Sequence, residues 1–263
     1  MILAINLVML VVVLAPVVVV IWMSFTPSAM FELPVTQFSL RWYREALSYP
    51  GFVDAFGLSF ELAALAAVIT VAVTFLAAYG LVRYRPRAGD ALRAFFTAPL
   101  LVSAVVFGIA MLQFVNKVGL YNKLIGLLLA HVVLVVPFAI RSLEVTLRAV
   151  PEELEWAAMI LGRSRLGTLV RVTLPLCARG LVTAFLFCFL LSFSEVTTTI
   201  FMTGPGLQTL PVRIYNYMSD RIDPTVAAVS ALVVMVSLAL LIILNLLGGL
   251  RRLTSHSSTR PLP

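Results

Sequence analysis

Long apolar runs alternate with short polar segments along the whole chain. Runs of mostly apolar residues occupy positions 2–23, 58–82, 93–114, 124–140, 181–202 and 225–250. A helix needs about 20 residues to cross the hydrocarbon core of a bilayer, so the pattern predicts six transmembrane helices. The fourth run is short, but without it both flanking loops would lie on the same side of the membrane.

Composition supports a membrane protein. Hydrophobic residues make up 61% of the 263 residues, charged residues only 12%, and the mean hydropathy is +1.05. These values lie far from those of soluble globular proteins. We therefore predict an all-α polytopic membrane protein with one transmembrane domain, residues 1–250, and a tail, residues 251–263.

The positions of Lys and Arg predict the orientation. Of the 19 basic residues, six lie in the loops that follow the first, third and fifth runs, and thirteen lie on the opposite side. Loops rich in Lys and Arg stay in the cytoplasm, so both termini and the loop 141–179 are predicted to be cytoplasmic. The net charge of +7 then follows from topology and does not indicate nucleic-acid binding.

The first run is predicted to be a retained span. No basic region precedes it, it is too long for a signal-peptide core, and no Ala-x-Ala cleavage site follows it. The missing basic flank suggests that the natural start lies upstream. Cys177 and Cys188 are eleven residues apart on one predicted helix, roughly 16 Å along its axis, which is too far for a disulfide.

The loop 141–179 contains a predicted helix over residues 152–161. Pro151 suits the first position of a helix, three glutamates follow in the first turn, and Gly162 suits a left-handed C-cap. Ala157 and Ala158 are small enough for another protein to approach the backbone closely. The same helix could instead lie on the bilayer, with Trp156 among the lipid headgroups.

These residues resemble the signature of the permease subunits of binding-protein-dependent ABC importers, which reads Glu-Ala-Ala, three residues, Gly, nine residues, Ile-x-Leu-Pro. Trp156, Ala157 and Ala158 fill the first triplet, Gly162 follows after three residues, and the motif ends at Val172 to Pro175. The spacing is intact. Trp156 stands where glutamate is usual, and Glu155 precedes it.

The segments 38–43 and 204–215 resemble those of the spermidine/putrescine branch. The resemblance implies a type I importer (MetI-like) fold in the bacterial inner membrane and a small cationic solute such as a polyamine. It implies as partners a cytoplasmic ABC ATPase dimer, a second permease subunit, a periplasmic solute-binding protein and membrane lipid. The residues that it implies couple to the ATPase are Glu152, Glu153, Glu155, Trp156, Ala157, Ala158, Gly162, Val172, Leu174 and Pro175.

The chain is predicted to be a transport subunit and not an enzyme. It has no Gly-x-x-x-x-Gly-Lys-Ser/Thr motif for a nucleotide phosphate, so a partner must hydrolyse ATP, and no cofactor is expected. His131 has no second ligand at metal-binding spacing and is expected to be a satisfied buried imidazole.

Glu195 is the acidic residue deepest in a predicted span, where an ionisable group normally faces a cavity or a partner. On a continuous helix it would share a face with Ser192 and Thr199. The predicted solute pathway comprises Ser192, Glu195, Thr198 and Thr199. An interhelical hydrogen-bond network, or a contact between permease subunits, is the other interpretation of these residues.

Two other classes of protein remain open. A self-contained secondary transporter or channel would carry inverted repeats, and a membrane enzyme or assembly subunit would carry an active-site cluster or another partner surface. Neither feature is visible in the sequence. Opines, iron and phosphorus-containing solutes are alternatives to a polyamine. No recognisable motif in the sequence identifies the partners or shows whether the two permease subunits are identical.

Overall fold

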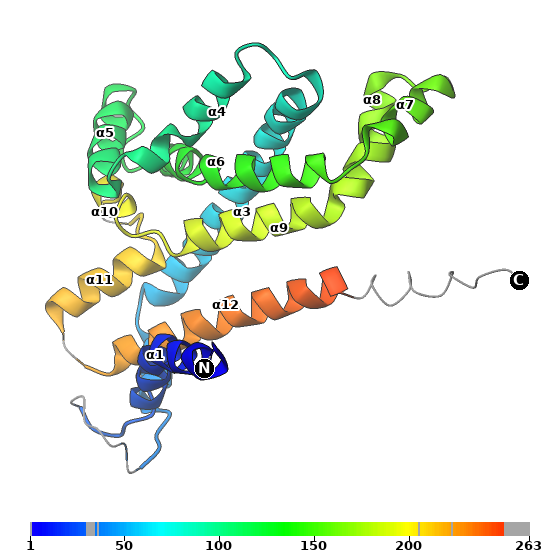
Figure 1. Ribbon diagram of the computed structural model, residues 1–263. Helices are drawn as coiled ribbons and strands as arrows, with labels where there is room; N and C mark the ends of the chain where they lie inside the picture. The colour runs from blue at the N-terminus through cyan, green and yellow to red at the C-terminus, as the bar shows by residue number, and fades with distance from the viewer. Residues whose placement is uncertain (1, 30–34, 36, 205, 222, 250–263) are drawn as a thin grey trace, which may run out of the picture. The chain divides into compact units, whose positions relative to one another are not determined.

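The computed structural model describes residues 2–29, 35, 37–204, 206–221 and 223–249, and the predicted tail, 251–263, lies outside them. The described part of the chain is helical and contains no strand (Figure 1). Its helices are α1 Ile2–Met23, α2 Arg41–Ser48, α3 Phe52–Tyr79, η1 Gly80–Tyr84, α4 Gly89–Thr97, η2 Ala98–Leu101, α5 Ala104–Lys117, α6 Leu124–Arg148, α7 Glu152–Ile160, α8 Arg165–Thr168, η3 Leu169–Thr173, α9 Leu174–Phe193, α10 Thr199–Met202, α11 Leu210–Asp220 and α12 Thr225–Gly249.

The all-α prediction is confirmed, and the number of spans agrees with it. Among the described residues, five helices are long and apolar enough to cross a membrane: Ile5–Met23, Phe52–Tyr84, Leu124–Arg148, Arg165–Phe193 and Thr225–Ile242. A sixth span results when the pair Gly89–Leu101 and Ala104–Lys117, which is bent by 103°, is counted as one.

That bent pair shows where the span predicted over residues 93–114 is broken. Pro99 lies in the 3₁₀ turn η2, and Ser103 has the extended values φ −58° and ψ 138°. Proline cannot donate a backbone hydrogen bond, and its ring crowds the preceding turn, so the helix ends and restarts in another direction.

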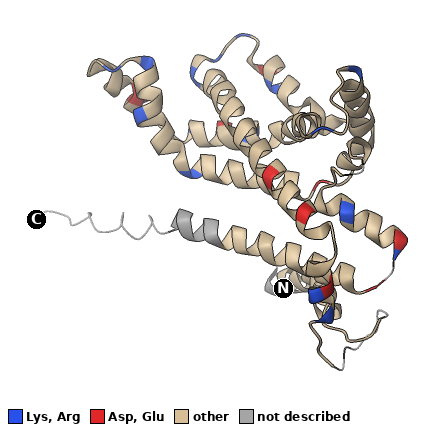
Figure 2. Cartoon of the chain, turned by 180° about the vertical axis from the view of Figure 1, so that it is seen from behind, with Lys and Arg blue, Asp and Glu red and all other residues tan. Residues whose placement is uncertain are grey.

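Helix ends also extend beyond the apolar runs. The second predicted span, 58–82, begins earlier in the structure, at Phe52, and the fourth, 124–140, continues to Arg148. In α6 the charged residues Arg141, Glu144 and Arg148 all lie in the last eight residues. Figure 2 shows how few charged residues the long helices carry. Charged turns can remain helical after the chain leaves the apolar layer, and hydropathy alone does not detect them.

The chain divides into two compact units. The first comprises Met1–Gly57 and Gln208–Ile242. Within it the rings of Tyr49, Phe52 and Tyr217 pack together at centroid distances of 5.0–5.3 Å. The Arg213 guanidinium lies 5.7 Å from the centre of the Tyr49 ring and donates a hydrogen bond to the Pro50 carbonyl at 3.3 Å. These contacts join the start of α3 to α11.

The second unit comprises Leu58–Leu207 and Ile243–Pro263. In it α6 and α9 lie side by side, and α5 lies against α10 (Figure 1). Gly180 of α9 is at the point of closest approach, because a Cβ there would overlap the Thr146 side chain of α6. Cys177 and Cys188 are buried and free, in agreement with the sequence analysis.

Candidate functional site

The helix that carries the family-like signature has the predicted ends. Glu152, Glu153 and Glu155 occupy the first turn of α7, and Gly162 has a φ of +86°. The Gly162 N–H donates to the Met159 carbonyl at 3.0 Å, and the Arg163 N–H donates to the Ala158 carbonyl at 3.1 Å. This is a Schellman cap. A Cβ at residue 162 would meet nothing within 4 Å, so the backbone angle, and not space, requires glycine here.

The next helix starts where the sequence predicts. The Ser164 hydroxyl accepts a hydrogen bond from the Gly167 N–H at 3.2 Å. From Arg165 the helix runs without a break to Phe193 and contains one π-turn, η3. That wide turn directly precedes Pro175 and makes room for its ring and missing N–H. The signature therefore spans a short helix, a glycine turn and the start of a transmembrane helix.

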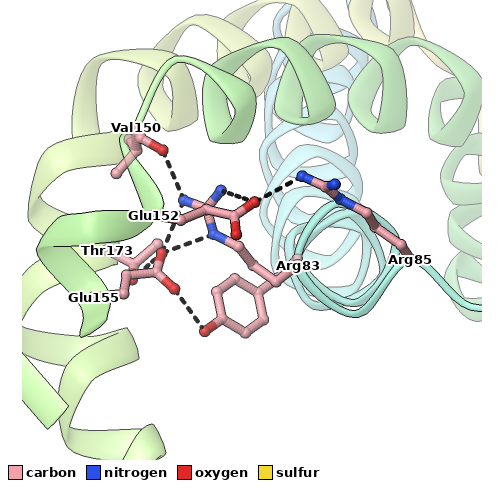
Figure 3. Close-up of polar contacts among 7 residues, drawn as sticks. Arg83, Arg85, Val150, Glu152, Glu155 and Thr173 are labelled. Carbon is pink, nitrogen blue, oxygen red and sulfur yellow. Dashed lines mark hydrogen bonds and ion pairs between the residues drawn. The ribbon is translucent and has the colours of Figure 1, made fainter.

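Glu155 is the most deeply buried residue of α7, with 5% of its surface exposed. Its carboxylate accepts hydrogen bonds from Arg83 Nε at 3.0 Å, from the Thr173 hydroxyl at 3.0 Å and from the Tyr79 hydroxyl at 3.1 Å, and it forms an ion pair with Arg83 Nη2 at 2.9 Å. Figure 3 shows the side chains of Arg83, Thr173 and Glu155 converging from η1, η3 and α7. A buried charge is tolerated only when it is paired and hydrogen-bonded in this way.

Arg83, at the end of the α3–η1 span, also contacts Val150 and Glu152 at the start of α7 (Figure 3). It donates to the Val150 carbonyl at 2.9 Å and lies 3.8 Å from a Glu152 oxygen. The exposed Arg85 contacts the same Glu152 oxygen at 3.0 Å. These contacts join the start of α7 to the end of the α3–η1 span.

The outer side of α7 is apolar. Trp156, Ile160 and Leu161 are 63%, 84% and 85% exposed. Glu153, Ala157 and Gly162 are also exposed, and so is Pro175. A cavity of about 540 Å³ lies beside this surface, lined by Tyr79, Arg83, Tyr84, Glu152, Glu155, Trp156, Met159, Ile160, Arg165 and Thr168.

The predicted coupling residues therefore separate into two groups. Glu155 faces inward, and Glu152, Ala158, Val172 and Leu174 are partly buried. Trp156, at the position where the related signature has glutamate, faces outward.

The predicted face formed by Ser192, Glu195 and Thr199 is wrong, because the helix is interrupted. α9 ends at Phe193, and α10 begins at Thr199. The Ser194 hydroxyl donates to the Leu190 carbonyl at 2.8 Å, and the Glu195 carboxylate accepts a hydrogen bond from the Thr198 N–H at 2.6 Å. The bond from the Thr198 N–H to the Glu195 side chain is of the local kind that competes with the helical ladder.

Burial separates the four predicted pathway residues. Ser192, Thr198 and Thr199 are 3%, 1% and 0% exposed, whereas Glu195 is only partly buried. The hydroxyls of Ser192 and Thr199 lie 2.7 and 3.0 Å from the two ring nitrogens of His131. His131 is 1% exposed, so the prediction of a satisfied buried imidazole is confirmed.

Sequence reasoning missed the partners of these residues. From the sequence alone, Arg83 is only one of the basic residues that predict orientation, and Tyr79 and Thr173 have no predicted role. The sequence does contain a signal for the Arg83–Glu155 pair. A basic residue ends one span on the predicted cytoplasmic side, and an acidic helix lies in the next loop on that side. Among the described residues, no group of three or more His, Cys, Asp or Glu side chains is placed to hold a metal ion.

Comparison with known proteins identifies similar membrane transport components. A family model described as "Binding-protein-dependent transport system inner membrane component" matches residues 1–253. The permease protein SmoH of the sulfoquinovosyl glycerol transport system of Agrobacterium fabrum is 32% identical over 239 residues, 85% of this chain and 82% of SmoH. The putrescine permease protein PotI of Escherichia coli is 28% identical over 226 residues, 83% of this chain and 80% of PotI.

Solved structures have the same fold. A bacterial ABC transporter involved in the import of the acidic polysaccharide alginate aligns with a TM-score of 0.66 at 17% identity, covering 94% of this chain and 95% of its own. The methionine transporter MetNI, in an inward-facing conformation, aligns with a TM-score of 0.60 at 18% identity, covering 75% of this chain and 93% of its own.

Proposed function

Because the chain belongs to the family of binding-protein-dependent transport system inner membrane components and is the permease subunit of an ABC importer, we propose that α7 docks on a cytoplasmic ATPase dimer and that the transported solute is a small cation of the polyamine class. In this proposal a periplasmic binding protein delivers the solute, and a second permease subunit completes the pathway. Both termini are then cytoplasmic, and the chain lies in the bacterial inner membrane.

The buried Arg83–Glu155 pair is the observation that carries the coupling proposal. It fixes α7 to the end of the α3–η1 span, so a force applied to α7 reaches the membrane helices without a flexible joint. The exposed side chains of Trp156, Ile160 and Leu161 leave a large apolar surface on the same segment. Apolar patches of this kind mark sites where a partner binds.

Trp156 determines the character of this contact. Glu155 is engaged inside the subunit and faces away from the docking surface, so it does not replace the glutamate that is usual one position later. An exposed indole supplies a large rigid contact area, which is typical of residues that dominate binding energy at protein interfaces. We propose that the partner ATPase accepts an aromatic ring at this point.

The coupling experiment replaces Trp156 and Ile160 by alanine in the assembled importer. We expect at least about tenfold weaker co-purification of the ATPase, since such anchors contribute about 1 kcal/mol or more each, while membrane insertion is unchanged. Val145→Ala is the matched control, because Val145 is 70% exposed on α6 outside the docking surface. Undiminished ATPase binding by the double variant would exclude α7 as the docking element.

The polyamine proposal rests on two observations. PotI and the Haemophilus influenzae spermidine/putrescine permease protein PotC, which is 27% identical, belong to polyamine systems. Glu195 places a partly exposed carboxylate at an interruption of a membrane helix, a position that suits a cationic group. The similarity to SmoH favours a second candidate, a sugar-containing solute of the kind that its name describes.

Glu195→Gln distinguishes these solutes when uptake of putrescine and of a neutral sugar glycoside is measured with the matching binding proteins. Loss of the carboxylate should lower putrescine uptake about tenfold or more, as expected for loss of a charged contact, and spare the neutral solute. Asp220→Asn, at an exposed position of α11, is the control. Equal responses of both solutes would remove charge recognition by Glu195.

A further inference from the structure

The two ends of the helix interruption at residues 194–198 are joined by one side chain. Ser192 lies just before the interruption, and Thr199 lies at the first position after it. The His131 ring of α6 contacts both hydroxyls, Nδ1 with Ser192 Oγ at 2.7 Å and Nε2 with Thr199 Oγ1 at 3.0 Å. We propose that His131 is a positioning residue that fixes the geometry of this interruption and thereby the direction of Glu195.

The imidazole ring is suited to this role. In its neutral form one ring nitrogen donates a hydrogen bond and the other accepts one, at separate positions on a rigid ring. The serine and threonine hydroxyls can each donate or accept, so either tautomer satisfies both contacts. All three residues are at most 3% exposed. Water therefore cannot replace a lost contact, and an unpaired buried group is costly.

The other hydrogen bonds of the segment are local in the chain. The Glu195 N–H donates to the Ser192 carbonyl at 3.3 Å, the Ile200 N–H donates to the Val196 carbonyl at 2.9 Å, and the Glu195 carboxylate accepts from the Thr198 N–H. Among the described residues, the Thr198 hydroxyl has no hydrogen-bond partner. On another side Gly108 of α5 allows close approach, because a Cβ there would lie 3.2 Å from Thr198 Cα. The two contacts of His131 are thus the side-chain bonds that reach the ends of the segment from another helix.

The inference has a structural part and a transport part. The structural part, that His131 orders the segment 194–198, depends only on the contacts described above. The transport part rests on the proposed function, in which Glu195 meets a cationic solute. The competing interpretation is that His131 only fills space between α6 and α9, in which case its two hydroxyl partners would not matter.

A nitroxide label at Thr197→Cys tests the structural part in the complete importer. Thr197 is exposed, and the native cysteines are buried. We compare His131→Leu, the pair Ser192→Ala and Thr199→Val, and the triple variant. Both the single and the paired variant should raise label mobility at residue 197 to the same extent, and the triple variant should add nothing. A second label, at Val145→Cys on α6, should be unaffected.

Two results would overturn the positioning role. Unchanged mobility at residue 197 in the single and the paired variant would show that the contacts do not order the segment. A change with His131→Leu but not with the Ser192 and Thr199 pair would show that volume alone matters. His131→Gln, which keeps one donor and one acceptor, should restore order partly. If His131→Leu fails to assemble, the paired variant, which leaves the ring in place, decides the question.

Putrescine uptake tests the transport part. We expect His131→Leu to lower uptake about tenfold through a higher apparent KM, since two buried hydrogen bonds are lost. Combination with Glu195→Gln should produce no further loss, because both changes act through the same carboxylate. Additive losses would contradict this. If Glu195→Gln leaves putrescine uptake unchanged while His131→Leu raises label mobility at residue 197, the cationic-solute proposal fails and the positioning role stands.

Discussion

Arg83 and Glu155 carry opposite charges on side chains that are only 8% and 6% exposed. The attraction between two buried charges is largely offset by the cost of removing them from water. Removing one partner is costly, because the other charge is then left buried and unpaired. Thr173 and Tyr79 complete the hydrogen bonding of the carboxylate. Glu155 thus joins α7 to Arg83, Tyr79 and Thr173 at once.

Glu155→Ala leaves the Arg83 charge without its carboxylate and should destabilise the protein by about 3 kcal/mol. Thermal unfolding of the purified protein in detergent measures the loss as a lower midpoint. The double variant Glu155→Leu with Arg83→Leu should recover part of it, because both charges are gone. Asp90→Ala is the control, since the Asp90 side chain is fully exposed. A midpoint unaffected by Glu155→Ala would contradict a structural role for the pair.

The sequence predicts some of these residues better than others. The acidic first turn of α7 and the left-handed Gly162 follow from local rules and are confirmed. The partner of Glu155 cannot be predicted from local rules, because Arg83 lies 72 positions away in the chain and only the tertiary structure brings the two side chains together. Local rules act within a few residues, whereas ion pairs of this kind depend on tertiary structure.

At the scale of helices, apolar content predicts how many spans exist but not where they bend. Residues 93–114 and 181–202 are apolar enough to look continuous, yet both are interrupted. Pro99 lies at one interruption, and within the other the Glu195 carboxylate accepts a hydrogen bond from the Thr198 N–H. Proline was a visible signal in the sequence, whereas the second break depends on which of several polar side chains turns back to the backbone.

Close packing of α6 and α9 gives a prediction at the same scale. Gly180→Ala should lower the unfolding midpoint, because the new Cβ overlaps Thr146 and forces the helices apart. Gly57→Ala is the matched control in α3, where a Cβ meets nothing within 4 Å. There alanine should raise the midpoint slightly, since it favours helix by about 0.5–1 kcal/mol over glycine.

Thr146→Gly combined with Gly180→Ala provides a further control. It removes the overlapping atoms and should restore part of the lost stability. Equal midpoints for Gly180→Ala and Gly57→Ala would show that the approach of α6 and α9 is not limited by residue 180.

At the scale of the whole molecule, composition and one short signature predict the class of protein well. A chain so poor in charge is predicted to place much of its surface in lipid. The matching family model, which describes an inner membrane component of a transport system, agrees with this inference. The solute is harder to predict, since PotI and SmoH, both similar over most of this chain, belong to systems named for different solutes.

The orientation of the molecule in the membrane supplies a last prediction. Basic residues are retained on the cytoplasmic side, so the loop that carries α7 should face the cytoplasm and α11 the periplasm. Single cysteines at the exposed positions Arg163 and Met218 report the two sides, and the buried Cys177 and Cys188 give little background. A maleimide that cannot cross membranes should label Met218→Cys in spheroplasts at once and Arg163→Cys only after permeabilisation. The reverse pattern would place α7 out of reach of a cytoplasmic ATPase, and the coupling proposal would fail with it.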